Sequence, residues 1–188
     1  ASPGSVGGRH IHAIWGDSQW LVGEYGLIGR RAGIGTPDWW FHPLDKVAHW
    51  PRLFGARGFT QYQCVIPGDV RVYRDFLTRF QRGGGSSFVS VLKDCGAAGR
   101  GPLSFPQPGA SLALDIPIQG QKTQRLVAEL NEFVIQHGGR IYLAKDAFTS
   151  AEHFRAMYPR LAEWEAVQRR WDPEGRLASA QSRRLLSG

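Results

Sequence analysis

Amide, hydroxyl, carboxylate and lysine side chains recur at alternating positions in segments rich in aromatic and β-branched residues, and these are the residues that could do chemistry. They are Gln61, Gln63, Lys93, Ser111, Asp115 and Lys145. Gathered on one sheet face, they could line a substrate pocket in which burial favours the uncharged amine of Lys145 and makes it a usable general base. The same alternation is typical of the solvated side of an antiparallel sheet that is covered on one face only. The pattern alone leaves both interpretations open.

Several other chemistries lack the residues they need. The glycines at 83–85 are not followed by Lys-Ser or Lys-Thr, and no G-x-G-x-x-G motif follows a strand pattern, so the sequence has no nucleotide-binding motif. The six histidines lack the spacing of a zinc site, and we expect no metal site. Cys64 and Cys95 have neither metal-ligand spacing nor a C-x-x-C pattern, so we expect two buried thiols.

The chain is basic, with 23 Lys and Arg against 16 Asp and Glu, which gives a net charge of +7. This charge suits an anionic partner such as a phosphate group or a lipid head group. The arginines are scattered singly or in pairs, without a basic run interleaved with aromatics, so we expect no nucleic acid partner. No stretch approaches the ~18 apolar residues of a spanning helix, so we expect a cytoplasmic or membrane-associated protein.

Six segments must position the polar residues. The sequence predicts strands over 59–67, 87–93, 111–118 and 140–144, a first helix that Asp69 caps and Gly83 ends, and a second helix over 122–137. The order β-α-β-β-α-β is that of a split βαβ unit. It predicts an α+β, ferredoxin-like fold, with a four-stranded antiparallel sheet, both helices on one face, and the other face free.

Further helices are predicted on both sides of this unit. The capping-box pattern from Thr149 to Glu152 indicates a short helix that Pro159 limits, and a last helix follows over 161–171. The segment after it, up to Gly188, has the composition of a polar tail. Upstream, helices are predicted over 12–31 and from Pro43. Residues 1–40 look like a leader, and the chain starts with Ala1, so we expect an excised piece of a longer protein.

Seven short motifs occur in a characteristic order. They are FHPLD at 41–45, GFTQYQCVIP at 58–67, PLSFP at 102–106, LDIP at 114–117, GGRIYLAKD at 138–146, MYPR at 157–160 and DPEG at 172–175. Together they resemble the C-terminal half of decaprenylphosphoryl-β-D-ribose 2-oxidase-like FAD-linked oxidoreductases, within the vanillyl-alcohol oxidase superfamily. The resemblance covers about residues 41–186.

Members of this family pair an FAD-binding domain with a substrate, or cap, domain. The resemblance therefore implies that residues 41–188 form the cap domain, and that the FAD-binding domain of the same protein is a partner that this chain lacks. It implies oxidation of a sugar or alcohol hydroxyl by hydride transfer to the flavin, with a polyprenyl-phosphate pentose as one substrate. The alternative from another class is a non-catalytic ferredoxin-like module that binds an anionic partner.

The resemblance assigns two residues to the side of the site that faces the cofactor. Lys145 matches a lysine beside the flavin and the substrate, which implies a catalytic base or an anchor for the substrate hydroxyl. Tyr142, on the same predicted strand, matches a residue near the FAD. On these grounds both residues are expected to contact the cofactor, and Lys145 is expected to be the catalytic residue.

Five further positions match the substrate side of the pocket. Gln63 and Lys93 match polar residues that face the substrate, and Lys93 could bind its phosphate. Ser111, Ala113 and Asp115 lie on one predicted strand and complete the set. Two positions depart from the best-known members: Ala113 stands where they carry Cys, and Ser111 stands where they carry Asn. The flavoprotein class is therefore a firmer expectation than the lipid-linked pentose.

Overall fold

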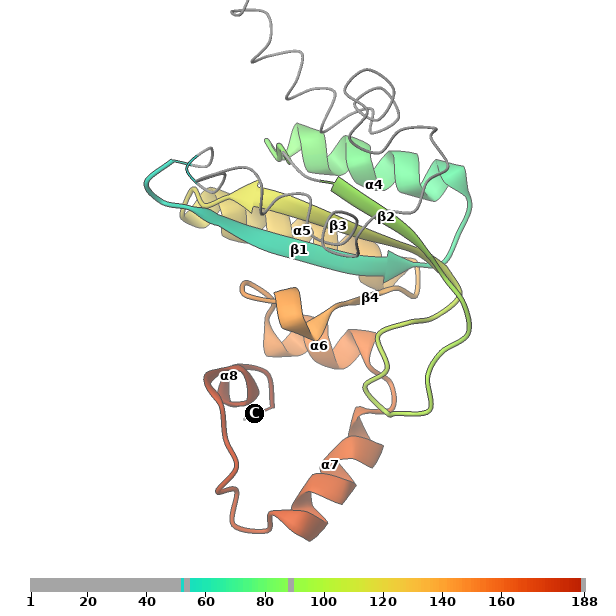
Figure 1. The fold of residues 1–188 in the computed structure, drawn as a ribbon, viewed down its shortest axis with the longest axis vertical. Coiled ribbons are helices and arrows are strands. Elements are labelled where there is room, and N and C mark those ends of the chain that lie inside the picture. Colours follow the sequence, from blue (N-terminus) through green and yellow to red (C-terminus); the bar gives the residue numbers. More distant parts are fainter. Residues whose placement is uncertain (1–51, 53–54, 88–89, 187–188) are drawn as a thin grey trace, which may run out of the picture.

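The computed structural model describes residue 52 and residues 55–87 and 90–186, and Figure 1 shows how they are arranged. The predicted leader over 1–40, the predicted helix over 12–31 and the predicted helix from Pro43 lie outside the described residues. No helix in the described part of the chain is both long enough and apolar enough to cross a membrane.

From Phe59 the chain follows the order that the sequence predicts. The elements are β1 (Phe59–Ile66), α4 (Val70–Arg82), β2 (Ser90–Cys95), β3 (Gly109–Pro117), α5 (Gln121–Gln136) and β4 (Arg140–Ile141). The strands form one sheet in the order β2-β3-β1-β4, in which every neighbouring pair is antiparallel. β3 therefore lies between β1 and β2, the two strands that α4 connects. The α+β class and the four-stranded antiparallel sheet are confirmed.

One side of the sheet packs against both helices and forms the core (Figure 1). Tyr62, Cys64 and Ile66 of β1 are buried on this side. The ring of Tyr62 stacks on Phe76 of α4 with centroids 6.2 Å apart, and its hydroxyl donates a 3.0 Å hydrogen bond to Asn131 of α5. β3 contributes Leu112, Leu114 and Ile116 to the same core. Both helices therefore contact the same face of β1, as the alternation predicts.

Local sequence signals set the ends of the two helices. The Asp69 carboxylate accepts a 2.8 Å hydrogen bond from the Arg71 amide and caps α4, and the Gly83 amide closes its last turn. α5 is followed by Gly138, whose φ of +64° is a left-handed conformation that glycine adopts without strain. The predicted helix boundaries are correct to within one residue or so at these ends.

The fourth strand is shorter than the predicted 140–144. β4 ends at Ile141, the Tyr142 amide donates a last 2.7 Å hydrogen bond to the Gln63 carbonyl of β1, and the chain then turns into the 3-10 helix η3 (Leu143–Lys145). The Leu143 carbonyl accepts a hydrogen bond from the side chain of Gln181, beyond the end of the strand ladder. Lys145 is therefore the last residue of η3, and the prediction that the strand runs to residue 144, directly before Lys145, is wrong.

Three helices follow the sheet, and one of them was not predicted. They are α6 (Ala151–Met157), α7 (Leu161–Trp171) and α8 (Ala180–Leu186). α6 is capped by the Ser150 hydroxyl, which accepts from the His153 amide over 3.2 Å, so the predicted cap at Thr149 is wrong by one residue. Thr149 is buried and bonds to Asn131 instead. α8 lies in the predicted polar tail, where tertiary contacts rather than local propensity stabilise seven residues.

The two cysteines differ in their surroundings. Cys64 is fully buried in the core, and burial raises the pKa of its thiol. Cys95 ends β2 and is half-buried, so the prediction of two buried thiols is correct for Cys64 and wrong for Cys95. Neither cysteine forms a disulfide in the described residues. Cys64 lies on the helix side of the sheet and is therefore remote from the polar side described next.

Candidate functional site

The side of the sheet opposite α4 and α5 carries a cluster of paired polar side chains, here called the polar cluster: Gln61, Gln63, Ser111 and Asp115. Gln61 lies directly across from Asp115 in the β1–β3 register, and its Nε2 donates to Asp115 Oδ1 over 2.8 Å. Gln63 lies across from Ala113 and reaches diagonally to Ser111, whose Oγ accepts from Gln63 Nε2 over 3.0 Å. The register of two strands therefore assembles the cluster.

The burial of these side chains distinguishes a pocket lining from a solvated sheet face. The exposed fractions of Gln63, Ser111 and Asp115 are 8%, 2% and 3%. A solvated sheet face would expose these side chains, so that interpretation is wrong for the centre of the face. Buried polar groups cost free energy unless they are hydrogen-bonded, and the two amide donations supply those bonds.

Lys145 approaches the polar cluster from η3, beside the β1–β4 pair. The lysine is half-buried, and its positive charge lowers the pKa of Asp115. Burial acts in the opposite direction and is the larger effect, so the pKa of Asp115 is raised, although the hydrogen bond from Gln61 also lowers it. Lys145 is thus near enough to Asp115 for its charge to act on that carboxyl group. An amine beside a buried carboxyl group can bind a substrate hydroxyl and accept its proton.

Lys93 and Ala113 extend the same face toward the edge of the sheet. Lys93 lies across from Ser111 in the β2–β3 register and therefore shares its side of the sheet, but the lysine is exposed. Ala113 lies between Val91 of β2 and Gln63 of β1 and is half-buried. The face thus changes from buried amides at its centre to an exposed cation at its edge, an arrangement that suits a ligand with an anionic group at one end.

Tyr142 lies on the same turn as Lys145. Its carbonyl accepts a 2.9 Å hydrogen bond from the Lys145 amide, and its side chain is 37% exposed. The ring packs on Phe105 with centroids 4.8 Å apart and an angle of 43° between the planes. Phe105 belongs to the loop between β2 and β3, to which the sequence assigned no role. An aromatic pair here could contact the flat ring of a cofactor.

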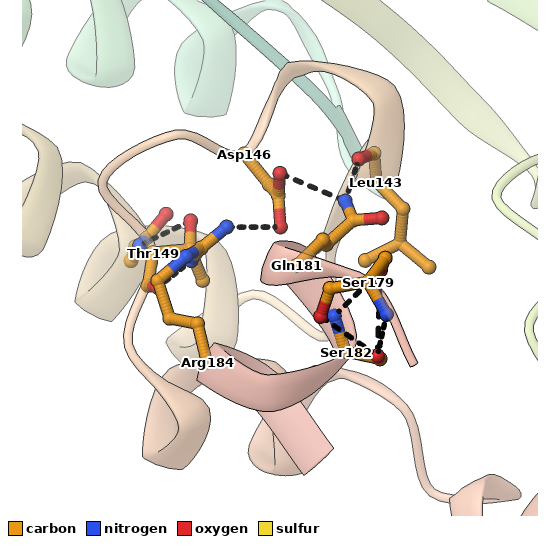
Figure 2. A network of polar contacts seen from close by, with 8 residues as sticks. Leu143, Asp146, Thr149, Ser179, Gln181, Ser182 and Arg184 are labelled. Carbon is orange, nitrogen blue, oxygen red and sulfur yellow. Dashed lines mark hydrogen bonds and ion pairs between the residues drawn. The ribbon is translucent and has the colours of Figure 1, made fainter. Parts of the chain in front are cut away.

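Sequence reasoning missed the residues that bind Asp146, the neighbour of Lys145 in the chain; Figure 2 shows their contacts with Asp146. The Asp146 carboxylate accepts a 2.9 Å hydrogen bond from Gln181 and forms a 3.0 Å ion pair with Arg184. Both partners lie on α8. A signal was present, because Gln181 and Arg184 are three residues apart and Leu185 is apolar. This is the spacing of a short helix with one polar side facing the protein.

Two further features concern what this part of the chain could bind. Within residues 52, 55–87 and 90–186, no group of three or more His, Cys, Asp or Glu side chains is arranged to hold a metal ion. An apolar groove lies between α7 and α8, lined by Trp164, Trp171, Leu177 and Leu185 among others. It contains no member of the polar cluster, so it is a separate feature of the surface.

Comparison with known proteins shows that the chain is similar to oxidases. Residues 112–185 match the family described as D-arabinono-1,4-lactone oxidase. The matched region runs from β3 to α8 and contains Asp115, Lys145 and Asp146. The resemblance to the C-terminal domain of FAD-linked oxidases is therefore confirmed.

Two curated proteins are similar to this chain over most of its length. The chain is 44% identical over 146 residues to decaprenylphosphoryl-beta-D-ribose oxidase of Mycolicibacterium smegmatis (strain ATCC 700084 / mc(2)155), which covers 77% of this chain and 32% of that protein. It is 33% identical over 131 residues to the "Uncharacterized protein in mprA 5'region" of Streptomyces coelicolor, covering 69% of this chain and 36% of that protein. The chain thus spans about a third of the length of the curated relatives it matches. The oxidase interpretation is favoured over the non-catalytic module.

Proposed function

We propose that this chain forms the substrate-binding side of an FAD-dependent oxidoreductase that oxidises a sugar or alcohol hydroxyl. The observation that carries the proposal is the buried polar cluster, on whose Asp115 the charge of Lys145 acts, with both of these residues in the region that matches an oxidase family. The FAD-binding domain is a partner in the same protein, and residues 41–188 act as the cap over the substrate.

The residues on this face fit a flavin and a hydroxyl substrate. Lys145 offers a donor that can contact the cofactor and the substrate together, and the exposed ring of Tyr142 offers an aromatic surface on the same turn. FAD, when bound, supplies the acceptor for the hydride that leaves the substrate carbon. Positioning and proton transfer are the work of the protein.

The chain's own residues account for orientation and for the proton. Gln63 and Ser111 fix each other by a 3.0 Å hydrogen bond, so they present polar atoms to the substrate in one geometry. As the substrate hydroxyl is oxidised, its O–H bond breaks, and we assign to Lys145 Nζ the role of the base that takes this proton or of the anchor that holds the hydroxyl. Asp115 lies beside this amine and shares a hydrogen bond with Gln61, which keeps the carboxyl group in place.

Lys93 supports a phosphate-bearing substrate. It lies at the exposed end of the face, across from Ser111, where a phosphate could remain in contact with water while the sugar enters the buried part. The Mycolicibacterium relative is by its name an oxidase of a decaprenylphosphoryl ribose. A polyprenyl-phosphate pentose is therefore the substrate we propose, with contact to a membrane surface that follows from such a lipid.

The test of the proposal is the replacement of Lys145 by Met and by Ala in the whole FAD-containing protein. Removing a general base costs about 10²–10⁴-fold in rate, so we expect single-turnover reduction of the flavin by substrate to slow by that factor. Lys122→Met, at an exposed position of α5, is the matched control and should change stability by less than about 0.5 kcal/mol. Near-native flavin reduction in a well-folded Lys145→Met variant would refute the assignment.

A further inference from the structure

We propose that α8 positions Lys145, because its Gln181 and Arg184 hold Asp146, the next residue along the chain, and so fix η3 against the polar cluster. The inference deepens the proposed function and rests on it. Gln181 and Arg184 touch neither the polar cluster nor Lys145 in the described contacts, so they are positioning residues.

η3 needs support from outside itself. It is three residues long, with Lys145 as its last residue, and no side chain caps its first turn. Short 3-10 helices have poor hydrogen-bond geometry and little intrinsic stability. A lysine at the end of such a turn keeps a fixed direction only if neighbouring elements hold the turn.

The Asp146 carboxylate is the main point of attachment. Its side chain is almost entirely buried, and each oxygen has its own donor on α8: Gln181 Nε2 at 2.9 Å from Oδ1, and an Arg184 guanidinium nitrogen at 3.0 Å from Oδ2. Removing one partner of a buried, hydrogen-bonded charge leaves that charge uncompensated. Asp146 is therefore tied to α8 more firmly than an exposed ion pair would be.

The same two side chains also bind the backbone at Leu143 and at Thr149, as Figure 2 shows. Gln181 donates to the Leu143 carbonyl, two residues before the lysine, and Arg184 donates to the Thr149 carbonyl, four residues after it. Two residues of α8 thus hold the whole segment from Leu143 to Thr149. α8 itself is anchored by Leu185, which is buried in the core.

The opposite side of the segment is attached to the sheet and to α5. The Tyr142 amide donates to the Gln63 carbonyl, and Asn131 donates to the Thr149 hydroxyl over 3.2 Å. These bonds fix the two ends of the segment. Its middle, where Lys145 lies, depends on α8.

Arg184→Met and Gln181→Ala test this role, with Arg183→Met as the matched control. Arg183 is the neighbouring arginine of the same helix and is exposed, so its replacement removes the same charge without touching Asp146. Arg184→Lys keeps a positive charge beside Asp146 and is the conservative variant. Each is made in the 188-residue chain and in the FAD-containing protein, and thermal melting checks folding.

The decisive readout is the titration of Asp115, followed by NMR of its carboxyl carbon in the full chain. Lys145 lowers the pKa of Asp115, so Lys145→Met raises the titration midpoint. If α8 positions the lysine, Arg184→Met and Gln181→Ala shift this midpoint in the same direction, Arg184→Lys restores part of the shift, and Arg183→Met leaves it unchanged. In the FAD-containing protein, Arg184→Met should slow flavin reduction about tenfold or more, because a displacement of 1 Å can cost about 10²-fold.

The outcomes separate this inference from the proposed function. A lower melting temperature with an unchanged Asp115 midpoint in Arg184→Met overturns the inference, because α8 would then only stabilise the fold. Should Arg184→Met fail to fold, Gln181→Ala decides by the same readout. Fast flavin reduction in Lys145→Met would overturn the proposed function, whereas the Asp115 titration would still report whether α8 sets the place of Lys145.

Discussion

At the scale of single residues, the surroundings of Asp115 disfavour the ionised form of its carboxyl group. Burial raises its pKa above the ordinary value of 3.8, and this effect exceeds the lowering by the Gln61 hydrogen bond and by the charge of Lys145. The folded chain therefore binds a proton at Asp115 more tightly than the unfolded chain does. The stabilisation from this proton is fully present below the unfolded pKa and is lost as the pH rises through the folded pKa.

Asp115→Asn should remove this dependence on pH. The amide cannot ionise and can still accept the hydrogen bond from Gln61, so we expect the free energy of unfolding of the variant to gain on that of the parent chain as the pH rises from about the ordinary pKa of 3.8 through the raised one. Urea unfolding at a series of pH values measures the difference. Asp75→Asn, at an exposed position of α4, is the control. A difference between Asp115→Asn and the parent that does not vary with pH would contradict the prediction.

At the scale of elements, one buried asparagine joins the sheet to two helices. Asn131 of α5 is fully buried, accepts from the Tyr62 hydroxyl of β1 over 3.0 Å, and donates to Thr149 at the start of α6 over 3.2 Å. It also lies 3.4 Å from His153 Nδ1 of α6. Buried polar networks are stabilising when every member has a partner, and they fix the relative placement of the elements that contribute.

Asn131→Leu should destabilise the chain. The Tyr62 hydroxyl would be left buried without its acceptor, which costs about 1–3 kcal/mol in free energy of unfolding. The double variant Tyr62→Phe with Asn131→Leu removes both partners and should recover part of this loss. Gln124→Leu, an exposed position of the same helix, serves as control in urea unfolding. A double variant that is destabilised by the sum of the two single losses would argue against the coupling.

The elements with strong local patterns were predictable, and those defined by distant contacts were not. The alternation in β1 and β3 and the spacing in α5 are local, and they correctly placed Gln63, Ser111 and Asp115 on one face. The Leu143 carbonyl just after β4 is bonded to Gln181, 38 residues later, and Gln181 of α8 is also bonded to Asp146, so these contacts are distant in the sequence. The burial of the polar face could not be predicted either, because the alternation of polar and apolar residues is the same whether the polar side of a sheet is covered or solvated.

At the scale of the whole molecule, the polar face offers residues for a substrate, but the sequence has no motif for binding a nucleotide cofactor. The chain spans about a third of the length of its curated relatives, and the region that matches the oxidase family begins at Leu112 in β3. Under the proposed function, this face with a lysine and an aromatic ring at its border would meet a second surface that carries the cofactor.

We therefore expect the purified 188-residue chain to retain no FAD. After incubation with FAD and gel filtration, the protein peak should lack flavin absorbance, because under the proposed function Lys145 and Tyr142 contact the cofactor from one side only. The FAD-containing protein, passed through the same column, is the positive control. A yellow protein peak for the chain alone would show that it holds the cofactor without a second domain.

Because β2 lies at the edge of the sheet, Lys93 has a second effect: its charge opposes self-association of the chain. Val91 and Leu92 of this strand are both exposed, and an apolar edge strand is a template on which another copy of the chain can add a strand. Charged side chains at such an edge act as gatekeepers, and Lys93 with Asp94 occupies that place. If Lys93 binds phosphate as proposed, its replacement by an apolar residue would weaken that contact and the protection against aggregation together. An exchange to Gln, which keeps the strand polar, separates recognition from solubility.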